Sequence, residues 1–246
     1  MTFWRGVDWQ RPWLAPYRAA GEETCGLLEQ GHSVAQALNR LNAARGTMLR
    51  AGPLRFVAQS ELPPGQAYED YIARSACVPT RDNLHDLFNG LVWSVFPTLK
   101  RRLNELQAEQ IALAGIGGTR GAVRDALTLF DENAALWQAP PGLVDALRAR
   151  DWTTLFVTRR EAWRDARTVL FGHALLEKLC TPRKPITAHA WPLPLQADPQ
   201  FHLLGALTPQ TLAAKGHLPL PVLGVPGWWP ANEAASFYAD RAVFRV

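Results

Sequence analysis

Apolar residues recur at helical spacing over residues 81–95, which form the clearest predicted element of the chain. The apolar positions follow the i, i+3, i+4, i+7 pattern of a helix with one buried face, and they are Leu84, Leu87, Phe88, Leu91, Val92 and Val95. Asp82 stands where an N-cap is expected, and Pro97 either ends this helix or starts the next one, which extends from Thr98 to about Ala112. Residues 1–50 also have a helical pattern, with one helix ending at Gly31 and another starting after Ser33.

Shorter apolar runs predict strands. They lie at residues 54–57, 126–130, 134–138, 167–171 and 185–195. Asp131, Glu132 and Asn133 separate two of these runs, so we predict a hairpin over residues 126–138 with the three polar residues in its turn. Further helices are predicted near Tyr68, over residues 142–165 and 172–179, and after Thr208.

These elements predict an α+β fold in a single globular domain that spans residues 1–246. We expect a predominantly helical domain with a small, mostly antiparallel sheet. The last fifty residues form a Pro/Trp-rich C-terminal segment, and residues 224–230 place Trp228 and Trp229 between prolines. This segment either offers a platform for a ligand or lies as a strap across the core. With 48% hydrophobic residues, the chain can bury a substantial core.

The charge and the cysteine content of the chain indicate which binding partners and which cellular compartment to expect. The net charge is +4, and short basic clusters lie at residues 100–102 and 159–160. Such clusters can contact an anionic ligand or nucleic acid, although a solvated helix face explains them as well. The three cysteines are far apart, the N-terminus lacks a signal-peptide pattern, and no run of apolar residues suits a membrane. We therefore expect a cytoplasmic protein without a membrane partner.

Three short polar groups carry the candidate chemistry. His85 and Asn89 are four residues apart on one helical face, beside Asp86, and His173 and Glu177 repeat this spacing. The third group is the acidic pair Asp131 and Glu132. If the three groups converge, they suit a divalent metal ion with nitrogen and oxygen ligands. They equally suit a metal-free acid/base pair in which a carboxylate orients each imidazole, or a hydrogen-bonded network with a structural role.

Three other motifs give weaker evidence of a functional role. The loop at residues 115–121 contains Arg120 and could bind an anion, but it lacks a phosphate-loop pattern, and a flexible connection explains it better. His189 lies among apolar residues of a predicted strand, which favours a structural role. Cys77 has no base nearby in the sequence.

Several motifs together resemble a known family. Residues 78–89 with Trp93 and Pro97, residues 124–132, residues 171–177, and residues 223–228 with Phe237 and Tyr238 are similar to motifs of an uncharacterised proteobacterial family, domain of unknown function 3025. The resemblance covers most of the chain and departs at Leu84, where the family more often has an aromatic residue. It implies a bacterial origin and no particular activity, but the polar groups at residues 85–89, 131–132 and 173–177 all fall within its motifs.

Two hypotheses follow. The first is a hydrolase-like enzyme, with or without a metal ion. In it, His85 and His173 act as ligands or acid/base groups, the carboxylates of Asp131, Glu132 and Glu177 act as ligands or bases, and Asp86 and Asn89 orient them. Arg81 and Arg124 would hold an anionic group of the substrate.

The second hypothesis is a non-enzymatic module that binds a protein or nucleic acid, in which the same residues form a structural network. One observation separates the two. The site requires both imidazoles and a carboxylate at one solvent-reachable cavity, and a separation of more than about 10 Å excludes it.

Overall fold

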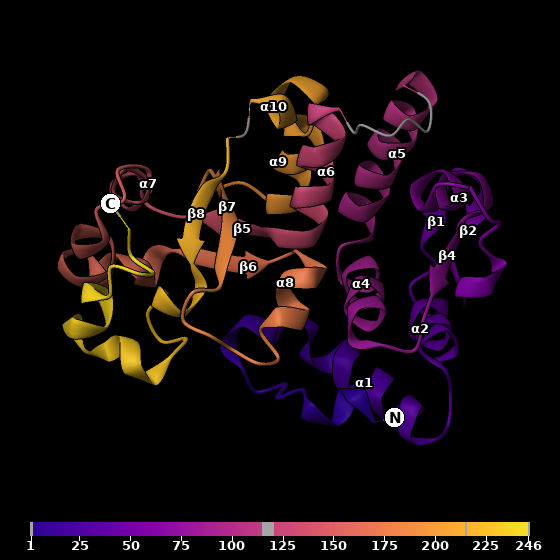
Figure 1. Cartoon of the computed structure of the whole chain (residues 1–246), viewed down its shortest axis with the longest axis horizontal. Helices are drawn as coiled ribbons and strands as arrows, with labels where there is room; N and C mark the ends of the chain where they lie inside the picture. The colour runs from indigo at the N-terminus through magenta and orange to yellow at the C-terminus, as the bar shows by residue number, and fades with distance from the viewer. Residues whose placement is uncertain (1, 115–120, 215, 246) are drawn as a thin grey trace.

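Helices form the N-terminal part of the computed structural model, which describes all residues except 1, 115–120, 215 and 246 (Figure 1). Two 3₁₀ turns, η1 (Phe3–Gly6) and η2 (Pro12–Tyr17), precede α1 (Arg18–Glu29) and α2 (Val34–Ala43). Ser33 caps α2 in a reciprocal capping box with Gln36, as expected for this residue pair. The helical prediction for the start of the chain is confirmed.

Two small strand pairs follow. β1 (Met48–Leu49) and β2 (Gly52–Pro53) form a short antiparallel pair. β3 (Arg55–Ala58) and β4 (Cys77–Thr80) run parallel, and the connection between them contains η3 (Gln59–Glu61) and α3 (Tyr68–Ser75). α3 ends at Ala76, which adopts the left-handed conformation and turns the chain directly into β4. This connection places the start of α3 beside the end of β4.

The central helices are α4 (Leu84–Val95), α5 (Pro97–Ala114), α6 (Ala122–Asn133) and α8 (His173–Lys178). Figure 1 shows them between the larger sheet on one side and the β1–β4 region with α3 on the other. The N-cap of α4 is Asn83, whose side chain accepts a hydrogen bond from the Asp86 N–H at 2.8 Å. The prediction of Asp82 as this cap was wrong, because its carboxylate accepts from the Val34 N–H of α2 at 2.8 Å.

The larger sheet has four strands in the order β6-β5-β7-β8. They are β5 (Ala134–Gln138), β6 (Arg167–Leu170), β7 (Thr187–Leu193) and β8 (Leu218–Pro221). β5 pairs antiparallel with β6 and parallel with β7, and β7 pairs antiparallel with β8. The α+β prediction, with its helical majority and small, mostly antiparallel sheet, is therefore confirmed.

The predicted hairpin over residues 126–138 was wrong in its first half. Residues 126–133 belong to α6, and only residues 134–138 form a strand. The buried positions Ala126, Leu127 and Phe130 lie on one helical face that packs against neighbouring helices. Asp131, Glu132 and Asn133 consequently occupy the last turn of a helix and not a hairpin turn.

The remaining elements connect the strands of the larger sheet or follow its last strand. α7 (Pro141–Arg148), the π-helical turn η4 (Thr154–Thr158) and η5 (Arg160–Asp165) connect β5 to β6, so the helical prediction over residues 142–165 is replaced by one helix and two short turns. α9 (Pro199–Ala206) and α10 (Pro209–Ala213) lie between β7 and β8, and Thr208 caps α10 as predicted. The turns η6 (Val222–Gly224), η7 (Pro230–Glu233) and η8 (Ala235–Ala239) end the chain.

The C-terminal aromatic residues pack against the rest of the protein. Trp228 contacts Trp13 at a centroid distance of 6.2 Å, and the Arg11 guanidinium lies 5.6 Å from the Trp229 ring. Tyr238 stacks on Phe156 at 4.9 Å within a second core cluster. These contacts favour the strap interpretation of this segment. The three cysteines are free, and no helix in the described part of the chain has the combined length and hydropathy needed to cross a bilayer.

Candidate functional site

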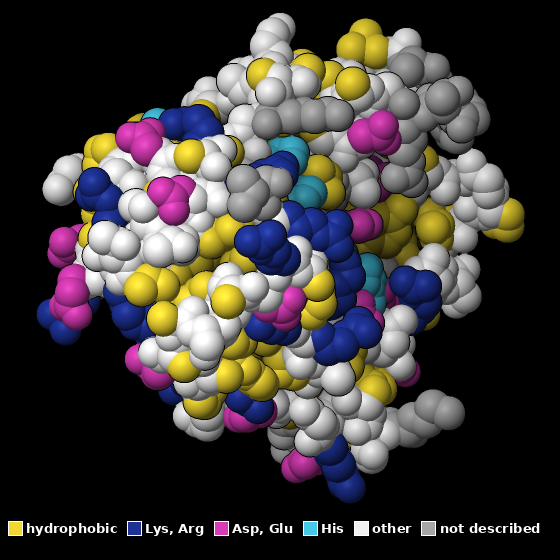
Figure 2. Space-filling model, turned by 60° about the vertical axis from the view of Figure 1, so that its left-hand side comes forward, with side chains coloured by type: hydrophobic (Ala, Val, Ile, Leu, Met, Phe, Trp, Pro, Cys, Tyr) yellow, Lys and Arg dark blue, Asp and Glu magenta, His cyan; other side chains and the backbone are white. Residues whose placement is uncertain are grey.

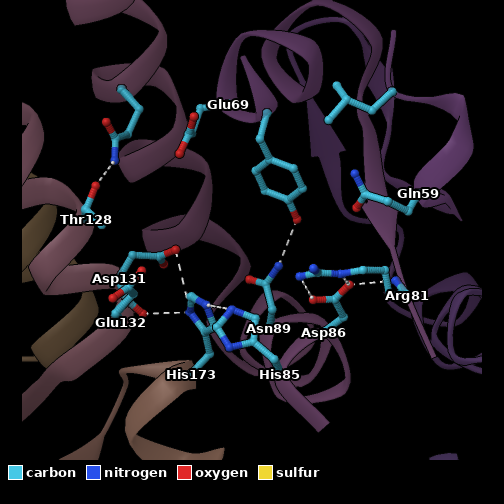
Figure 3. Close-up of a pocket in the computed structure, with 13 residues that line it drawn as sticks. Gln59, Glu69, Arg81, His85, Asp86, Asn89, Thr128, Asp131, Glu132 and His173 are labelled. Carbon is cyan, nitrogen blue, oxygen red and sulfur yellow. Dashed lines mark hydrogen bonds and ion pairs between the residues drawn. The ribbon is translucent and has the colours of Figure 1, made fainter. Parts of the chain in front are cut away.

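A cavity of about 310 Å³ lies where α3, α4, α6 and α8 approach one another (Figure 3). Most of its lining side chains are polar. They are Gln59, Tyr68, Glu69, Arg81, His85, Asp86, Asn89, Gln107, Thr128, Asp131, Glu132 and His173, with Leu62 as an apolar neighbour. Residues that are far apart in the sequence, from Gln59 to His173, thus line one solvent-reachable cavity.

The two imidazoles of the candidate set touch each other at this cavity. The Nε2 atoms of His85 and His173 lie 3.1 Å apart, and the ring planes meet at 77°. His85 comes from the first turn of α4, and His173 is the first residue of α8, directly after Gly172. The backbone of Gly172 lies so close to the end of α6 that a Cβ there would come within 2.4 Å of the Glu132 carbonyl oxygen. A residue without a side chain is therefore required for this approach.

The other nitrogen of each imidazole has its own acceptor. Nδ1 of His173 lies 2.8 Å from the main-chain carbonyl oxygen of Asp131, and Nδ1 of His85 lies 2.9 Å from a carboxylate oxygen of Glu177. A carbonyl oxygen only accepts, so His173 carries its proton on Nδ1. The corresponding partner of His85 Nδ1 is a carboxylate oxygen of Glu177. The two Nε2 atoms lie within hydrogen-bond distance of each other, so one of them donates a proton to the other.

The protonation state of His173 follows from its surroundings. Its side chain is only 7% exposed, and this burial lowers its pKa to about 4, although the Asp131 carboxylate works in the opposite direction. The imidazole is therefore neutral at pH 7 and presents an unprotonated Nε2 to its neighbour. His85 is one-third exposed, so this ring is the one that solvent and ligands in the cavity can reach more freely.

A buried lysine supports the cavity wall. Lys100 of α5 is 5% exposed, and its ammonium lies 2.6 and 2.9 Å from the two carboxylate oxygens of Asp131. Burial by itself would raise the pKa of Asp131, but the Lys100 ammonium and the nearby imidazoles outweigh it and keep this pKa below its usual value. Asp131 thus remains a carboxylate, and its position at the end of α6 is fixed by an ion pair.

Lys100 also positions Asn89 and, through Asn89, the Tyr68 hydroxyl by a series of hydrogen bonds. Lys100 donates to the side-chain oxygen of Asn89 at 2.8 Å, and the Asn89 amide donates to the Tyr68 hydroxyl oxygen at 3.0 Å. Burial, together with the carboxylates of Asp86 and Asp131, raises the pKa of Tyr68 well above its usual value, so the phenol keeps its proton. That proton has no acceptor among the described residues. Tyr68 is therefore a hydrogen-bond donor available to a ligand in the cavity.

The two candidate arginines have different environments. Arg81 lines the cavity and forms a two-pronged ion pair with Asp86, with both N···O distances at 3.0 Å, and its side chain is 58% exposed. The Arg81 main-chain N–H also donates to Asp86 at 2.6 Å. Arg124 lies near the start of α6 and is not among the lining residues. Of the two residues proposed to bind an anionic group, only Arg81 is at the cavity.

Polar residues at the cavity or directly behind its wall were not singled out as site residues in the sequence analysis. Lys100, Asn104 and Gln107 are buried polar residues at i, i+4 and i+7 of α5, with Gln107 at the cavity and Asn104 bonded to the Glu69 carbonyl. A polar stripe at helical spacing, on a helix that also has an apolar stripe, was the available signal. Tyr68 gave no comparable signal, because α3 and α4 meet only in the folded protein.

Two other candidate residues lie outside the cavity, and the predicted loop at residues 115–121 with Arg120 falls largely outside the described residues. His189 stacks on His217 at 4.3 Å, and burial followed by His217 lowers its pKa to about 4. Cys77 is buried in β4 and contacts Arg55.

The basic clusters are largely engaged in ion pairs. Arg101 and Arg102 each lie 3.9 Å from Glu105, and Arg160 pairs with Glu233 at 2.6 Å. Figure 2 shows one face of the molecule on which Lys and Arg side chains gather near the middle, among hydrophobic and uncharged groups. The third member of the first cluster, Lys100, is the buried residue of the cavity wall. Intramolecular pairing therefore accounts for much of this charge.

The donor types at the cavity suit a metal ion, but their arrangement is incomplete. Imidazole and carboxylate are common ligands of zinc and related ions. Within the described residues, no group of three or more His, Cys, Asp or Glu side chains is arranged to hold one ion. The protein side chains thus provide at most two ligands at the His85–His173 contact as it stands.

The comparison with known families supports the resemblance predicted from the motifs. A family model described as "Protein of unknown function (DUF3025)" matches residues 54–246. This range contains all the residues that line the cavity, together with Glu177 and Lys100. No curated protein and no solved structure matches the chain.

Proposed function

Because the chain belongs to the DUF3025 family, whose members are described as of unknown function, we propose its activity from the cavity alone: a hydrolase-type enzyme. The observation that carries the proposal is the contact between the Nε2 atoms of His85 and His173 at the cavity wall, with each Nδ1 held by an acceptor. Burying and orienting several titratable groups at one cavity is costly, and such clusters are typical of active sites.

Hydrolysis by an activated water molecule is the reaction that this arrangement suits best. An imidazole nitrogen at the cavity can activate water by withdrawing its proton, and the hydrogen bond to the second imidazole can hold that ring in place. The described lining residues include no serine or cysteine, and the Thr128 hydroxyl lies 3.3 Å from the Gln107 amide, which donates to it. Attack by water therefore fits the cavity better than attack by a side-chain nucleophile.

The supporting residues have distinct roles in this proposal. The Glu177 carboxylate and the Asp131 carbonyl orient the two imidazoles, as the partners of active imidazoles commonly do. Asn89 directs the Tyr68 hydroxyl toward the cavity, and Asp86 fixes Arg81 at its rim. The Tyr68 hydroxyl and the outer edge of Arg81 then contact an oxygen atom of the substrate on which negative charge develops during hydrolysis.

A substrate panel tests the proposal. The protein is assayed with chromogenic carboxylic esters, phosphate monoesters, phosphate diesters and amides, with and without added divalent metal ions. We expect turnover of at least one class, and we expect His85→Gln and His173→Gln to lower its kcat/KM by about 10²- to 10⁴-fold, as for loss of an acid/base group. His202→Gln is the matched control, because His202 is exposed on α9 and lies outside the cavity.

The opposite result supports a binding module. If folded protein turns over none of the four classes, or if the His85 and His173 variants retain the wild-type rate, the hydrolase proposal is wrong. Circular dichroism and thermal unfolding of each variant establish that a lost rate does not come from a lost fold.

A further inference from the structure

The charged side chains that line the cavity are mostly carboxylates. They are Glu69, Asp86, Asp131 and Glu132, against the single arginine Arg81. Arg81 is paired with Asp86, and Lys100, which is buried behind the cavity wall, is paired with Asp131. The carboxylates of Glu69 and Glu132 have no ion pair in the described part of the chain. In a protein with a net charge of +4, this cavity therefore carries an excess of negative charge.

The charges are distributed unevenly around the cavity. Figure 3 shows Glu69 and Glu132 on one side and Arg81 on the opposite side. The rings of His85 and His173 lie between the two sides. Walls of low dielectric constant concentrate the field of such charges, so the side with the unpaired carboxylates attracts a cation. A positively charged group of a substrate is therefore expected on that side, next to the proposed reaction centre.

Two uncharged groups of the lining also lack a partner. Gln107 is 6% exposed, and its amide donates to Thr128, but its side-chain oxygen has no hydrogen bond with any described residue. The Tyr68 hydroxyl accepts from Asn89, and its proton has no acceptor within the described ranges. Buried polar groups without partners are costly, and natural proteins contain few of them. A ligand with both an N–H donor and an oxygen acceptor satisfies both groups.

We infer that the cavity binds a small substrate with a protonated amino group close to a carbonyl group. The ammonium contacts the Glu69 carboxylate and the Gln107 oxygen, since these two residues also line the same small recess beside the cavity. Glu132 adds negative charge at the exposed rim. The carbonyl oxygen accepts from the Tyr68 hydroxyl, on the way toward Arg81. A volume of about 310 Å³ suits a molecule the size of an amino acid derivative.

The same charges disfavour phosphate esters. The two cations at the cavity, Arg81 and Lys100, already contact carboxylates, so an anionic substrate would meet uncompensated negative charge. Carboxylic esters and amides with a nearby amino group remain. In their hydrolysis, water adds to the carbonyl carbon, the bond from that carbon to the leaving oxygen or nitrogen breaks, and the leaving atom takes up a proton. The inference thus deepens the proposed function, on which this reaction rests, by naming the substrate class.

Matched probes test the inference through binding alone. Alaninamide and propanamide differ in the amino group, and the binding of each to the full chain near neutral pH is measured by ligand-observed NMR, which also records any hydrolysis. We expect alaninamide to bind at least about 10-fold more tightly, as for one hydrogen bond to a charged group. Phenyl phosphate is the anionic probe and should bind more weakly than alaninamide.

Variants identify the residues that bind the amino group. Glu69→Gln should weaken the binding of alaninamide by about 10-fold and leave that of propanamide unchanged. Glu132→Gln should have a smaller effect of about 2- to 5-fold, because Glu132 is exposed. Glu109→Gln is the matched control, since Glu109 is an exposed glutamate of α5 outside the cavity, and it should bind as the wild type does. Circular dichroism establishes that each variant is folded.

Four results overturn the inference. They are equal affinities for alaninamide and propanamide, a wild-type preference in Glu69→Gln, tighter binding of phenyl phosphate than of alaninamide, and no binding of alaninamide at millimolar concentrations. The hydrolase proposal is decided separately by the substrate panel. A protein that prefers the amine but hydrolyses nothing keeps the amine site and loses the hydrolase. A protein that hydrolyses esters or amides regardless of the amino group keeps the hydrolase and loses the amine site.

Discussion

Substitution of Lys100 by methionine tests the ion pair that supports the cavity wall. The change keeps the length of the side chain and removes the ammonium that contacts Asp131 at 2.6 and 2.9 Å and Asn89 at 2.8 Å. Breaking a buried pair by removing one partner costs about 3–5 kcal/mol, because the remaining charge stays buried without compensation. Asp131 is 25% exposed and can recover some hydration, so we expect a loss near the lower limit, about 3 kcal/mol.

The free energy of unfolding is measured by urea denaturation, followed through tryptophan fluorescence. Lys184→Met is the matched control, because the Lys184–Asp240 pair has a similar distance of 3.0 Å but is 29% and 38% exposed. Such a pair contributes about 1 kcal/mol or less. In the double variant Lys100→Met/Asp131→Asn, the unpaired carboxylate that Lys100→Met leaves at Asp131 is absent. The total loss of stability should therefore be smaller than the sum of the two single losses by more than about 1 kcal/mol. Equal losses in Lys100→Met and Lys184→Met, or strict additivity in the double variant, would refute the reasoning.

Three further outcomes are expected. Gly172→Ala places a Cβ 2.4 Å from the backbone of Glu132 and should lower the free energy of unfolding, measured by urea denaturation, by about 1–3 kcal/mol. The control Gly26→Ala adds a Cβ in open space on α1 and should be neutral or stabilising, and similar values for the two variants would contradict the close approach. Asn83→Ala removes the cap of α4 and should cost about 1 kcal/mol, and an unchanged midpoint would argue against the cap. The folded-state pKa of His189 is about 4, below its ordinary value, so folding favours the neutral imidazole. The contribution of His189 to stability is complete above pH 6.5 and decreases as the pH falls toward 4. His189→Gln should reduce this decrease by about 1 kcal/mol after allowance for partial exposure, measured as the difference in unfolding free energy between pH 7 and pH 4.5.

The helical parts of the fold were predictable because their apolar residues repeat over several turns. Residues 84–95 satisfy the helical pattern at six positions, and the observed helix differs from the prediction only at its start. The run at residues 126–130 contains too few residues to distinguish a strand from one face of a helix, and its environment decides between them. The packing of Ala126, Leu127 and Phe130 against other helices is information that the local sequence does not contain.

The polar residues of the candidate site could be selected from the sequence, but the buried lysine that pairs with one of them could not. His85, His173, Asp131 and Glu132 were singled out because each pair has a recognisable spacing, and the fold brings these residues to one cavity. Lys100 was assigned to a surface cluster because two arginines follow it. A lysine next to arginines is usually solvated, and only the position of Asp131 on the neighbouring helix makes its burial favourable.

The main-chain acceptor of His173 has a consequence for genetics. The last carbonyl groups of a helix have no partner within the helix, and the carbonyl of Asp131, in the last turn of α6, is one that His173 uses. No codon change can delete this oxygen, whereas a single base change can remove the carboxylate of Glu177 that serves His85. A random-mutagenesis screen for lost function should therefore recover Glu177 readily. It should detect the partner of His173 only indirectly, through substitutions such as those at Gly172 that shift the end of the helix.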